Sequence, residues 1–159
     1  MSKEAQYREV RKRLRSLLDG ECDAIAAMST IACELFHAFD QFDWVGFYRV
    51  VAPGLLKVGP YQGGHGCLTI SFDRGVCGKC AREGITQLVS DVQAVPYHIA
   101  CSSTTRSEIV VPVFDATETV RAVLDIDSNQ PAVFDIVDQK ELEGICGMVH
   151  QLNLKEGSD

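Results

Sequence analysis

The chain has 159 residues, of which 46% are hydrophobic and 23% charged, as expected for one packed globular domain rather than a disordered or collagen-like chain. Its 15 Lys and Arg residues against 22 Asp and Glu residues give a formal net charge of -7, which argues against nucleic acid or anionic lipid as a partner. No apolar stretch approaches the roughly 20 residues of a membrane span, and no apolar signal segment opens the chain, so we expect a cytoplasmic protein.

Cysteine is frequent for a chain without a secretory signal. There are seven cysteines, an odd number, so a structural disulfide framework is disfavoured. In a reducing compartment such residues are buried apolar fillers, metal ligands or reactive thiols. The position of each cysteine relative to the predicted elements indicates which role to expect.

Two helices are predicted at the start of the chain. Residues 4–19 and about 23–37 both carry apolar side chains at helical spacing, and Gly20 separates them. The core stripe of the first helix comprises Tyr7, Val10, Leu14, Leu17 and Leu18. Cys22 and Cys33 belong with the second helix, where we expect both to be inert fillers.

Strands dominate the middle of the chain, with Pro53-Gly54 as a hairpin turn. Six stretches favour strands: 42–51, 55–58, 68–72, 88–92, 108–114 and 119–127. A short helix is expected from near Gly75, a closing amphipathic helix over 134–154 and a polar tail over 155–159. This order predicts an α+β fold, with an antiparallel sheet of about six strands and helices from both termini packed on one face.

Four cysteines lie in the irregular, glycine-rich range 59–84 or in the range 94–105: Cys67, Cys77, Cys80 and Cys101. Thiols in accessible loops are candidate nucleophiles, because reactivity follows the thiolate fraction and access. Cys77 and Cys80 form a C-x-x-C, which is typical of a redox pair or half a zinc site. Only isolated histidines, at positions 65 and 98, are available as further ligands, so zinc is disfavoured. Near the start of the short helix, both thiols should have a pKa below the usual value of roughly 8.5.

Acidic residues mark two neighbouring strands. Asp125 and Asp127 lie on the same face of one strand, since side chains alternate with a period of two, and Glu108 opens the preceding strand. Carboxylates at close range repel, so one of them can hold a proton near neutral pH. The alternative interpretation is a solvated strand edge.

Two aromatic residues, Trp44 and Tyr48, are four positions apart in the first predicted strand and therefore share a face. Such residues are usually part of the core. A small apolar box beside the acidic groups is the functional alternative.

Seven segments together resemble the free methionine-(R)-sulfoxide reductases, which are single GAF-domain enzymes: GPYQG at 59–63, Cys67, FDRGVCG at 72–78, DV at 91–92, HIAC at 98–101, RSEIVVPV at 106–113 and VLDIDS at 123–128. Ordinary GAF domains share the sheet but not these cysteines. The resemblance covers nearly the whole chain beyond the first helix. It implies one GAF domain over 1–159, with the N-terminal helix in 1–20.

The resemblance also implies roles for the candidate residues. Cys101 corresponds to the nucleophile, Cys67 to the principal resolving thiol and Cys77 to a further redox-active thiol, with the choice between the last two as dominant resolving thiol left open. Cys80 stands where the family usually has Ala and is treated as a bystander. Trp44 and Tyr48 correspond to the pocket for the methylsulfinyl group, and an acidic cluster over the sulfoxide oxygen and the ammonium comprises Glu108, Asp125 and Asp127.

The implied activity is the reduction of free L-methionine-(R)-sulfoxide during oxidative stress. A sulfoxide needs an acid at its oxygen before a thiolate attacks its sulfur, which explains why carboxyl groups accompany the cysteines. Attack leaves a sulfenic acid, which condenses with a second thiol to a disulfide. A thioredoxin-like dithiol then resets the enzyme, and no metal or organic cofactor is required.

The resemblance further implies a homodimer and a substrate enclosed by the loops 59–66 and 94–105, which would exclude peptides. Two other functions are considered: a small-molecule-binding GAF sensor and a thiol redox switch without turnover. The sensor is disfavoured because the chain is short and has no output module. Turnover of the free sulfoxide separates the first function from both alternatives.

Overall fold

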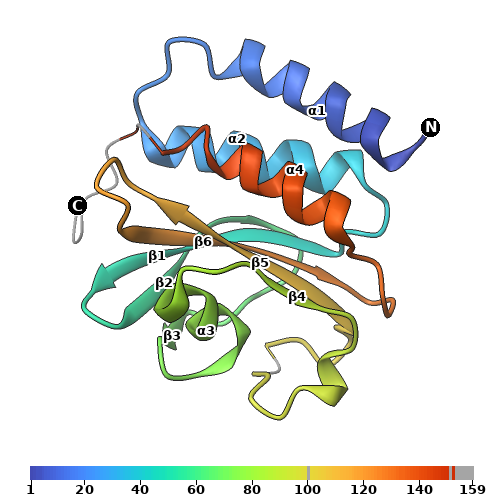
Figure 1. The fold of residues 1–159 in the computed structure, drawn as a ribbon, viewed down its shortest axis with the longest axis vertical. Helices are drawn as coiled ribbons and strands as arrows, with labels where there is room; N and C mark the ends of the chain where they lie inside the picture. The colour runs from blue at the N-terminus through green and yellow to red at the C-terminus, as the bar shows by residue number, and fades with distance from the viewer. Residues whose placement is uncertain (100, 151, 153–159) are drawn as a thin grey trace.

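The computed structural model describes residues 1–99, 101–150 and 152. Its centre is an antiparallel sheet of six strands in the order β3-β2-β1-β6-β5-β4 (Figure 1). The strands are β1 (Trp44–Ala52), β2 (Leu55–Gln62), β3 (Thr69–Ser71), β4 (Gln87–Val89), β5 (Ser107–Phe114) and β6 (Val120–Ser128). The predicted α+β class and the six-stranded antiparallel sheet are therefore confirmed.

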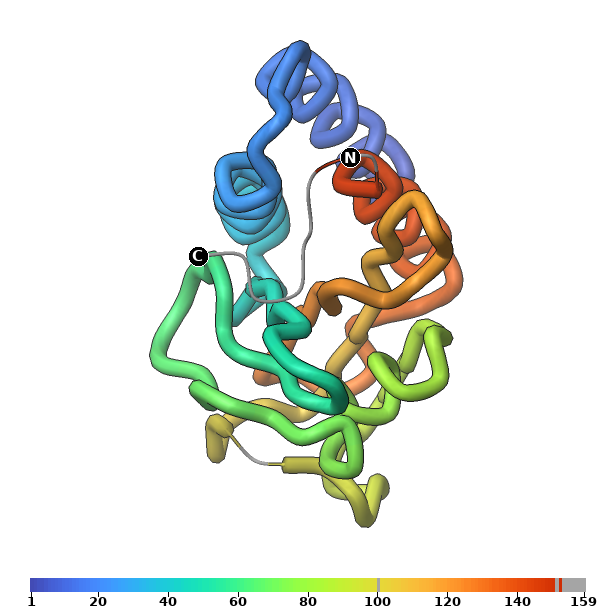
Figure 2. The backbone as a smooth tube through the Cα atoms, turned by 90° about the vertical axis from the view of Figure 1, so that its left-hand side faces the viewer, coloured from blue at the N-terminus to red at the C-terminus, as the bar shows by residue number. Residues whose placement is uncertain are grey.

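Helices cover the two faces of the sheet unequally. Three helices cover one face as a helical layer: α2 (Ala24–Ala38) and α4 (Ile136–Cys146) lie against the sheet, and α1 (Lys3–Leu17) packs over these two helices on their outer side (Figure 1). The other side carries α3 (Gly75–Glu83), the 3-10 turn η1 (Val92–Ala94) and the segment that follows η1, as the side view in Figure 2 shows. Helices from both ends of the chain thus pack on the same face, as predicted.

The strands divide their side chains between two cores, because successive residues point to opposite faces. Val45 and Phe47 of β1 pack under the helical layer together with apolar residues of β5 and β6. Trp44 and Tyr48, at the alternate positions, belong to the second core with side chains from β2, α3, β5 and β6. This second face holds the candidate functional residues.

The C-terminal helix is shorter than the predicted range 134–154. Asp135 caps its N-terminus with a capping box, and α4 ends at Cys146. Gly147 is the C-cap, and beyond it Met148 and Val149 donate to carbonyl oxygens three residues back, so the chain continues in tighter turns instead of the α-helix. The last residues of the predicted helix and the predicted tail 155–159 lie outside the described residues.

Strand β2 extends beyond its predicted end at residue 58. Gly59 and Pro60 lie opposite Phe47, at an irregularity in the pairing of β1 with β2. Proline has no N–H for a regular ladder, and a bulge accommodates it without ending the strand. The glycine and proline that predicted an irregular segment therefore mark a bulge.

Smaller differences occur in other elements. The predicted strand 88–92 corresponds to β4, and its last residue, Val92, begins η1. The first helix matches its predicted range, but Leu17, which we assigned to the core stripe, is 57% exposed. None of the helices in the described part of the chain is long and apolar enough to cross a membrane.

Candidate active site

A cavity of about 230 Å³ opens on the sheet face opposite the helical layer. Its walls come from β1, β5, β6 and α3 and from the segments that follow β2 and η1. The volume is below the roughly 300–1,000 Å³ of pockets for drug-sized ligands, so the cavity suits a molecule the size of an amino acid. Most of the residues predicted for a functional site line it: Trp44, Tyr48, Cys77, Cys101, Glu108, Asp125 and Asp127.

Three carboxyl groups form the floor of the cavity because of how β5 and β6 pair. Glu108 lies directly opposite Asp127, and Asp125 lies two positions away on β6 and therefore on the same face. Glu108 and Asp125 are each only 5% exposed, and Asp127 is half-buried. The alternative of a solvated strand edge is wrong, because β6 pairs with β1 on one side and β5 on the other.

Burial raises the pKa of all three carboxyl groups, because the charged oxygens lose their water. Repulsion by Asp125 raises the pKa of Glu108 and Asp127 further. Burial raises the pKa of Asp125 to about 6. Hydrogen bonds to this carboxylate, first of all with Glu108, act in the opposite direction and limit the rise. The cluster therefore holds protons near neutral pH, as expected for carboxylates at close range.

Cys77 and Cys80 both lie on α3 but have different surroundings. Cys77 lines the cavity beside Asp125, whereas the Sγ atom of Cys80 donates to the carbonyl oxygen of Val110 at 3.5 Å. Burial raises the pKa of both thiols, and the charges of Asp125 and Glu108 raise that of Cys77 further. The predicted lowering of these pKa values is wrong, because burial and nearby carboxylates outweigh the helix N-terminus.

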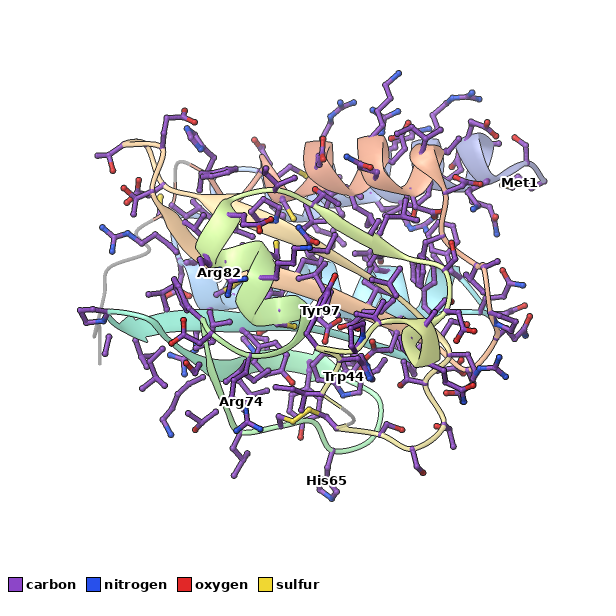
Figure 3. The ribbon with its side chains drawn as sticks, turned by 60° about the horizontal axis from the view of Figure 1, so that its bottom comes forward. Met1, Trp44, His65, Arg74, Arg82 and Tyr97 are labelled. Carbon is purple, nitrogen blue, oxygen red and sulfur yellow. A yellow bond between two sulfur atoms is a disulfide. The ribbon has the colours of Figure 1, made fainter. Side chains whose placement is uncertain are left out.

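Cys67 and Cys101 form a disulfide bond, with their Cα atoms 5.4 Å apart. Cys101 is exposed and lines the cavity, and Cys67 is half-buried. Figure 3 shows the bond in yellow between the labelled Trp44 and His65, on the side away from the helical layer. The structure thus contains the pairing that the resemblance implies, above an acidic floor.

Among the described residues, the other five cysteines are free thiols: Cys22, Cys33, Cys77, Cys80 and Cys146. Cys22 and Cys33 are exposed, so the expectation that they are buried fillers is wrong. Cys22 lies before the N-cap of α2, outside the helix, and Cys33 lies on the exposed side of α2. Location in a predicted helix is therefore a poor guide to the burial of a cysteine.

Stacked aromatic rings form one wall of the cavity. The ring centroids of Trp44 and Tyr48 are 5.8 Å apart, and those of Trp44 and Tyr61 are 5.3 Å apart. The indole N–H of Trp44 donates to the carbonyl oxygen of Gly64 at 2.9 Å. A Cβ atom at Gly66 would lie 2.9 Å from both the Trp44 ring and the Tyr48 hydroxyl, so glycine lets this loop close against the aromatic wall.

His98 is a cavity residue whose role the sequence reasoning missed. Its Nε2 atom lies 3.6 Å from Oε2 of Glu108, and burial lowers the pKa of the imidazole. In the sequence this histidine stands out as an isolated zinc ligand and as the first residue of the HIAC segment, but not as a partner of Glu108. Its position three residues before Cys101 was the available signal, because the segment that presents the cysteine also presents the histidine.

The fold is that of a GAF domain, and the family profile of the GAF domain matches residues 22–150. The free methionine-R-sulfoxide reductase of Saccharomyces cerevisiae is 34% identical over 157 residues, which are 95% of this chain and 87% of the yeast protein. The Escherichia coli protein of the same name is 32% identical and covers 96% of this chain, with 89% of its own length matched.

A solved structure gives the same assignment. The X-ray structure of free methionine-R-sulfoxide reductase from Neisseria meningitidis in complex with its substrate has a TM-score of 0.89 and 42% sequence identity, covering 94% of this chain and 89% of that chain. The chain therefore belongs to the GAF-domain family and, within it, to the free methionine-R-sulfoxide reductases.

The raised pKa of Asp125 predicts that this residue destabilises the fold when it is ionised. Its pKa rises from 3.8 to about 6 on folding, so the penalty is absent below the unfolded value and complete above the folded value. We expect Asp125→Asn to gain about 2 kcal/mol in unfolding free energy, relative to wild type, on going from about pH 4 to about pH 8. Urea unfolding at both pH values measures this, with the exposed Asp73→Asn as control. An equal pH dependence in Asp125→Asn and wild type would contradict the assignment.

The contact of Gly66 with Trp44 predicts a spectroscopic effect. Trp44 is the only tryptophan, so intrinsic fluorescence reports on the cavity alone. In Gly66→Ala the new methyl group must displace the indole, and we expect a shift of the emission to longer wavelength as water reaches the ring. Gly64→Ala is the matched control, because its Cβ would meet no atom within 4 Å. Identical spectra for the two variants would refute the contact.

Proposed function

We propose that the protein reduces free L-methionine-(R)-sulfoxide to methionine by thiol chemistry. The observation that carries this proposal is the disulfide of Cys67 with Cys101 at a small cavity whose floor is an acidic cluster with raised pKa values. Relatives named for this activity, one of them solved in complex with its substrate, support the same conclusion.

The reaction begins from the reduced protein. The thiolate of Cys101 attacks the sulfoxide sulfur while a carboxyl group of the cavity floor donates a proton to the oxygen, which makes the sulfur electrophilic. The oxygen passes to the cysteine sulfur, methionine leaves, and Cys101 becomes a sulfenic acid. The substrate is reduced by two electrons and the cysteine is oxidised by two.

The second step closes the disulfide. The Cys67 thiol attacks the sulfenic acid of Cys101, and water leaves as the sulfur–sulfur bond forms. In the disulfide form the Cα atoms are 5.4 Å apart, within the range of ordinary disulfide bonds. We propose Cys77, a buried free thiol on the same cavity, as a further redox-active residue.

Recycling requires an external reductant, for which we propose a thioredoxin-like protein. Cys101 is exposed, so an incoming thiolate has access to the disulfide. The free cysteines beside this single disulfide suit a reducing cytoplasm, which we propose as the compartment, with oxidative stress as the setting. A homodimer is proposed on the resemblance to the family.

Specificity follows from the size and charge of the cavity. We propose that Trp44 and Tyr48 contact the methylsulfinyl group and that the acidic cluster also attracts the substrate ammonium. Both aromatic residues are at most 8% exposed, which leaves a small apolar wall beside the carboxyl groups. A methionine sulfoxide inside a peptide chain has no free ammonium, and its neighbours add bulk at both ends.

Replacement of the two disulfide cysteines separates the two steps. We expect Cys101→Ser to release no methionine even in a single turnover of the reduced protein, because it lacks the nucleophile. Cys67→Ser should release about one methionine per chain and then lose steady-state cycling with thioredoxin, unless Cys77 replaces the missing thiol. Methionine release and NADPH consumption with thioredoxin reductase measure the two effects.

The exposed Cys22→Ser is the control and should behave as wild type. Methionine release by Cys101→Ser would contradict the assignment of the nucleophile. Disulfide formation with an oxidant but no methionine release by the wild type would favour the thiol switch, and binding of a ligand without turnover would favour the sensor.

Substrate discrimination tests the cavity itself. We expect kcat/KM for the free R epimer to exceed that for the S epimer and for N-acetylmethionine-R-sulfoxide by at least about a hundredfold. The S epimer points its oxygen away from the acidic cluster when its methyl group contacts the aromatic wall, and the acetylated compound has no ammonium for the cluster to attract. Equal rates with the acetylated compound would show that the ammonium is not recognised.

A further inference from the structure

Cys77, Glu108 and Asp125 bring three possible metal ligands together at the buried end of the cavity. One sulfur and two carboxylate oxygens of these residues lie within 4.8 Å of one another, and all three residues are buried. We propose that this cluster binds one divalent cation of the zinc group, Zn²⁺ or Cd²⁺, and that the bound cation excludes substrate from the cavity. Metal binding at this site involves neither the Cys67–Cys101 disulfide nor the proposed function, whereas the exclusion of substrate rests on that function.

Two buried oxygens point to a missing positive partner. Among the described residues, Oε2 of Glu108 and Oδ1 of Asp125 accept no hydrogen bond from any group other than the thiol and carboxyl groups of the cavity itself. Each residue is only 5% exposed, so bulk water has little access to these oxygens. Buried polar atoms without partners are destabilising, and a cation between these oxygens would satisfy both.

His98 offers a fourth ligand. Its Nε2 atom is 3.6 Å from Oε2 of Glu108, too far for a hydrogen bond but close to the ligand separation in a metal site. With bonds of roughly 2.0–2.3 Å, tetrahedral ligands of Zn²⁺ lie about 3.3–3.8 Å apart. His98 is not among the three residues whose ligand atoms lie within 4.8 Å of one another, so the imidazole would have to move toward Cys77 and Asp125 to complete a four-ligand site.

The donor set determines which cations fit. A thiolate with carboxylate and imidazole favours Zn²⁺ or Cd²⁺ over Mg²⁺ and Ca²⁺, which prefer oxygen ligands alone. Binding displaces the thiol proton of Cys77 and the carboxyl protons into solvent, and no electron is transferred. This site differs from the C-x-x-C zinc site that the sequence suggests. The Cys80 thiol donates a hydrogen bond to the carbonyl oxygen of Val110 and is not one of the proposed ligands.

The test uses the full chain in its disulfide form with Cys22→Ser and Cys33→Ser. These changes remove the exposed thiols, one of which lies 3.7 Å from Nδ1 of His37 and would bind metal itself. Titration with CdCl₂ is followed by the ultraviolet absorption of the thiolate–cadmium bond. We expect about one Cd²⁺ per chain, displaced by Zn²⁺ and unaffected by a large excess of Mg²⁺.

Variants identify the ligands. Adding Cys77→Ser should abolish the absorption band, whereas Cys80→Ser, the matched change of a buried thiol on the same helix, should preserve it. Glu108→Gln leaves the thiol in place and should weaken Cd²⁺ binding by about tenfold or more, which keeps the test decisive if Cys77→Ser does not fold. Absence of the band in the starting protein, or its persistence in Cys77→Ser, would overturn the proposal.

A competition experiment tests the second half of the proposal. Zn²⁺ should raise the apparent KM for methionine sulfoxide without changing kcat, and Glu108→Gln should require about tenfold more Zn²⁺ for the same effect. Inhibition that lowers kcat alone would show that the ion acts elsewhere. If the protein does not reduce methionine sulfoxide at all, the cadmium titration still decides the metal site, so the two proposals fail separately.

Discussion

The free-energy cost of burying three carboxyl groups on one face of the sheet determines both the protonation of the cavity and its proposed chemistry. The pairing of β5 with β6 sets Glu108 opposite Asp127, and the two-residue period adds Asp125 beside them. Ionised together they would repel one another without water to screen them, so the cluster keeps protons. The same protons serve the proposed reaction, because a sulfoxide oxygen must be protonated as the thiolate attacks. The buried carboxyl groups that destabilise the fold are thus the proposed proton donors of the cavity.

Much of this arrangement could be predicted from the sequence, because strand periodicity is a local property. The spacing of Asp125 and Asp127, and that of Trp44 and Tyr48, fixes which side chains share a face once the strand is recognised. The distribution of apolar residues likewise predicts the two end helices and the layer they form. The pairing of Cys67 with Cys101 came from resemblance to a family, since no local pattern joins residues 34 positions apart.

Other features depend on tertiary contacts that no local pattern reports. The burial of Cys77 arises where α3 packs on β5 and β6, so its raised pKa could not be read from its place at a helix start. The exposure of Cys22 and Cys33 was missed because cysteine is small enough for either side of a helix. The position of His98 beside Glu108 likewise depends on how the segment after η1 packs against the sheet.

The central claim is that the acidic cluster is protonated at neutral pH beneath the reactive thiol. Carboxyl carbon NMR of protein labelled at Asp and Glu, assigned with Glu108→Gln, Asp125→Asn and Asp127→Asn, measures this directly. At least one of these groups should still be protonated at about pH 7, well above the pKa of roughly 4 of ordinary carboxyl groups. Complete ionisation of all three by about pH 5 would contradict it.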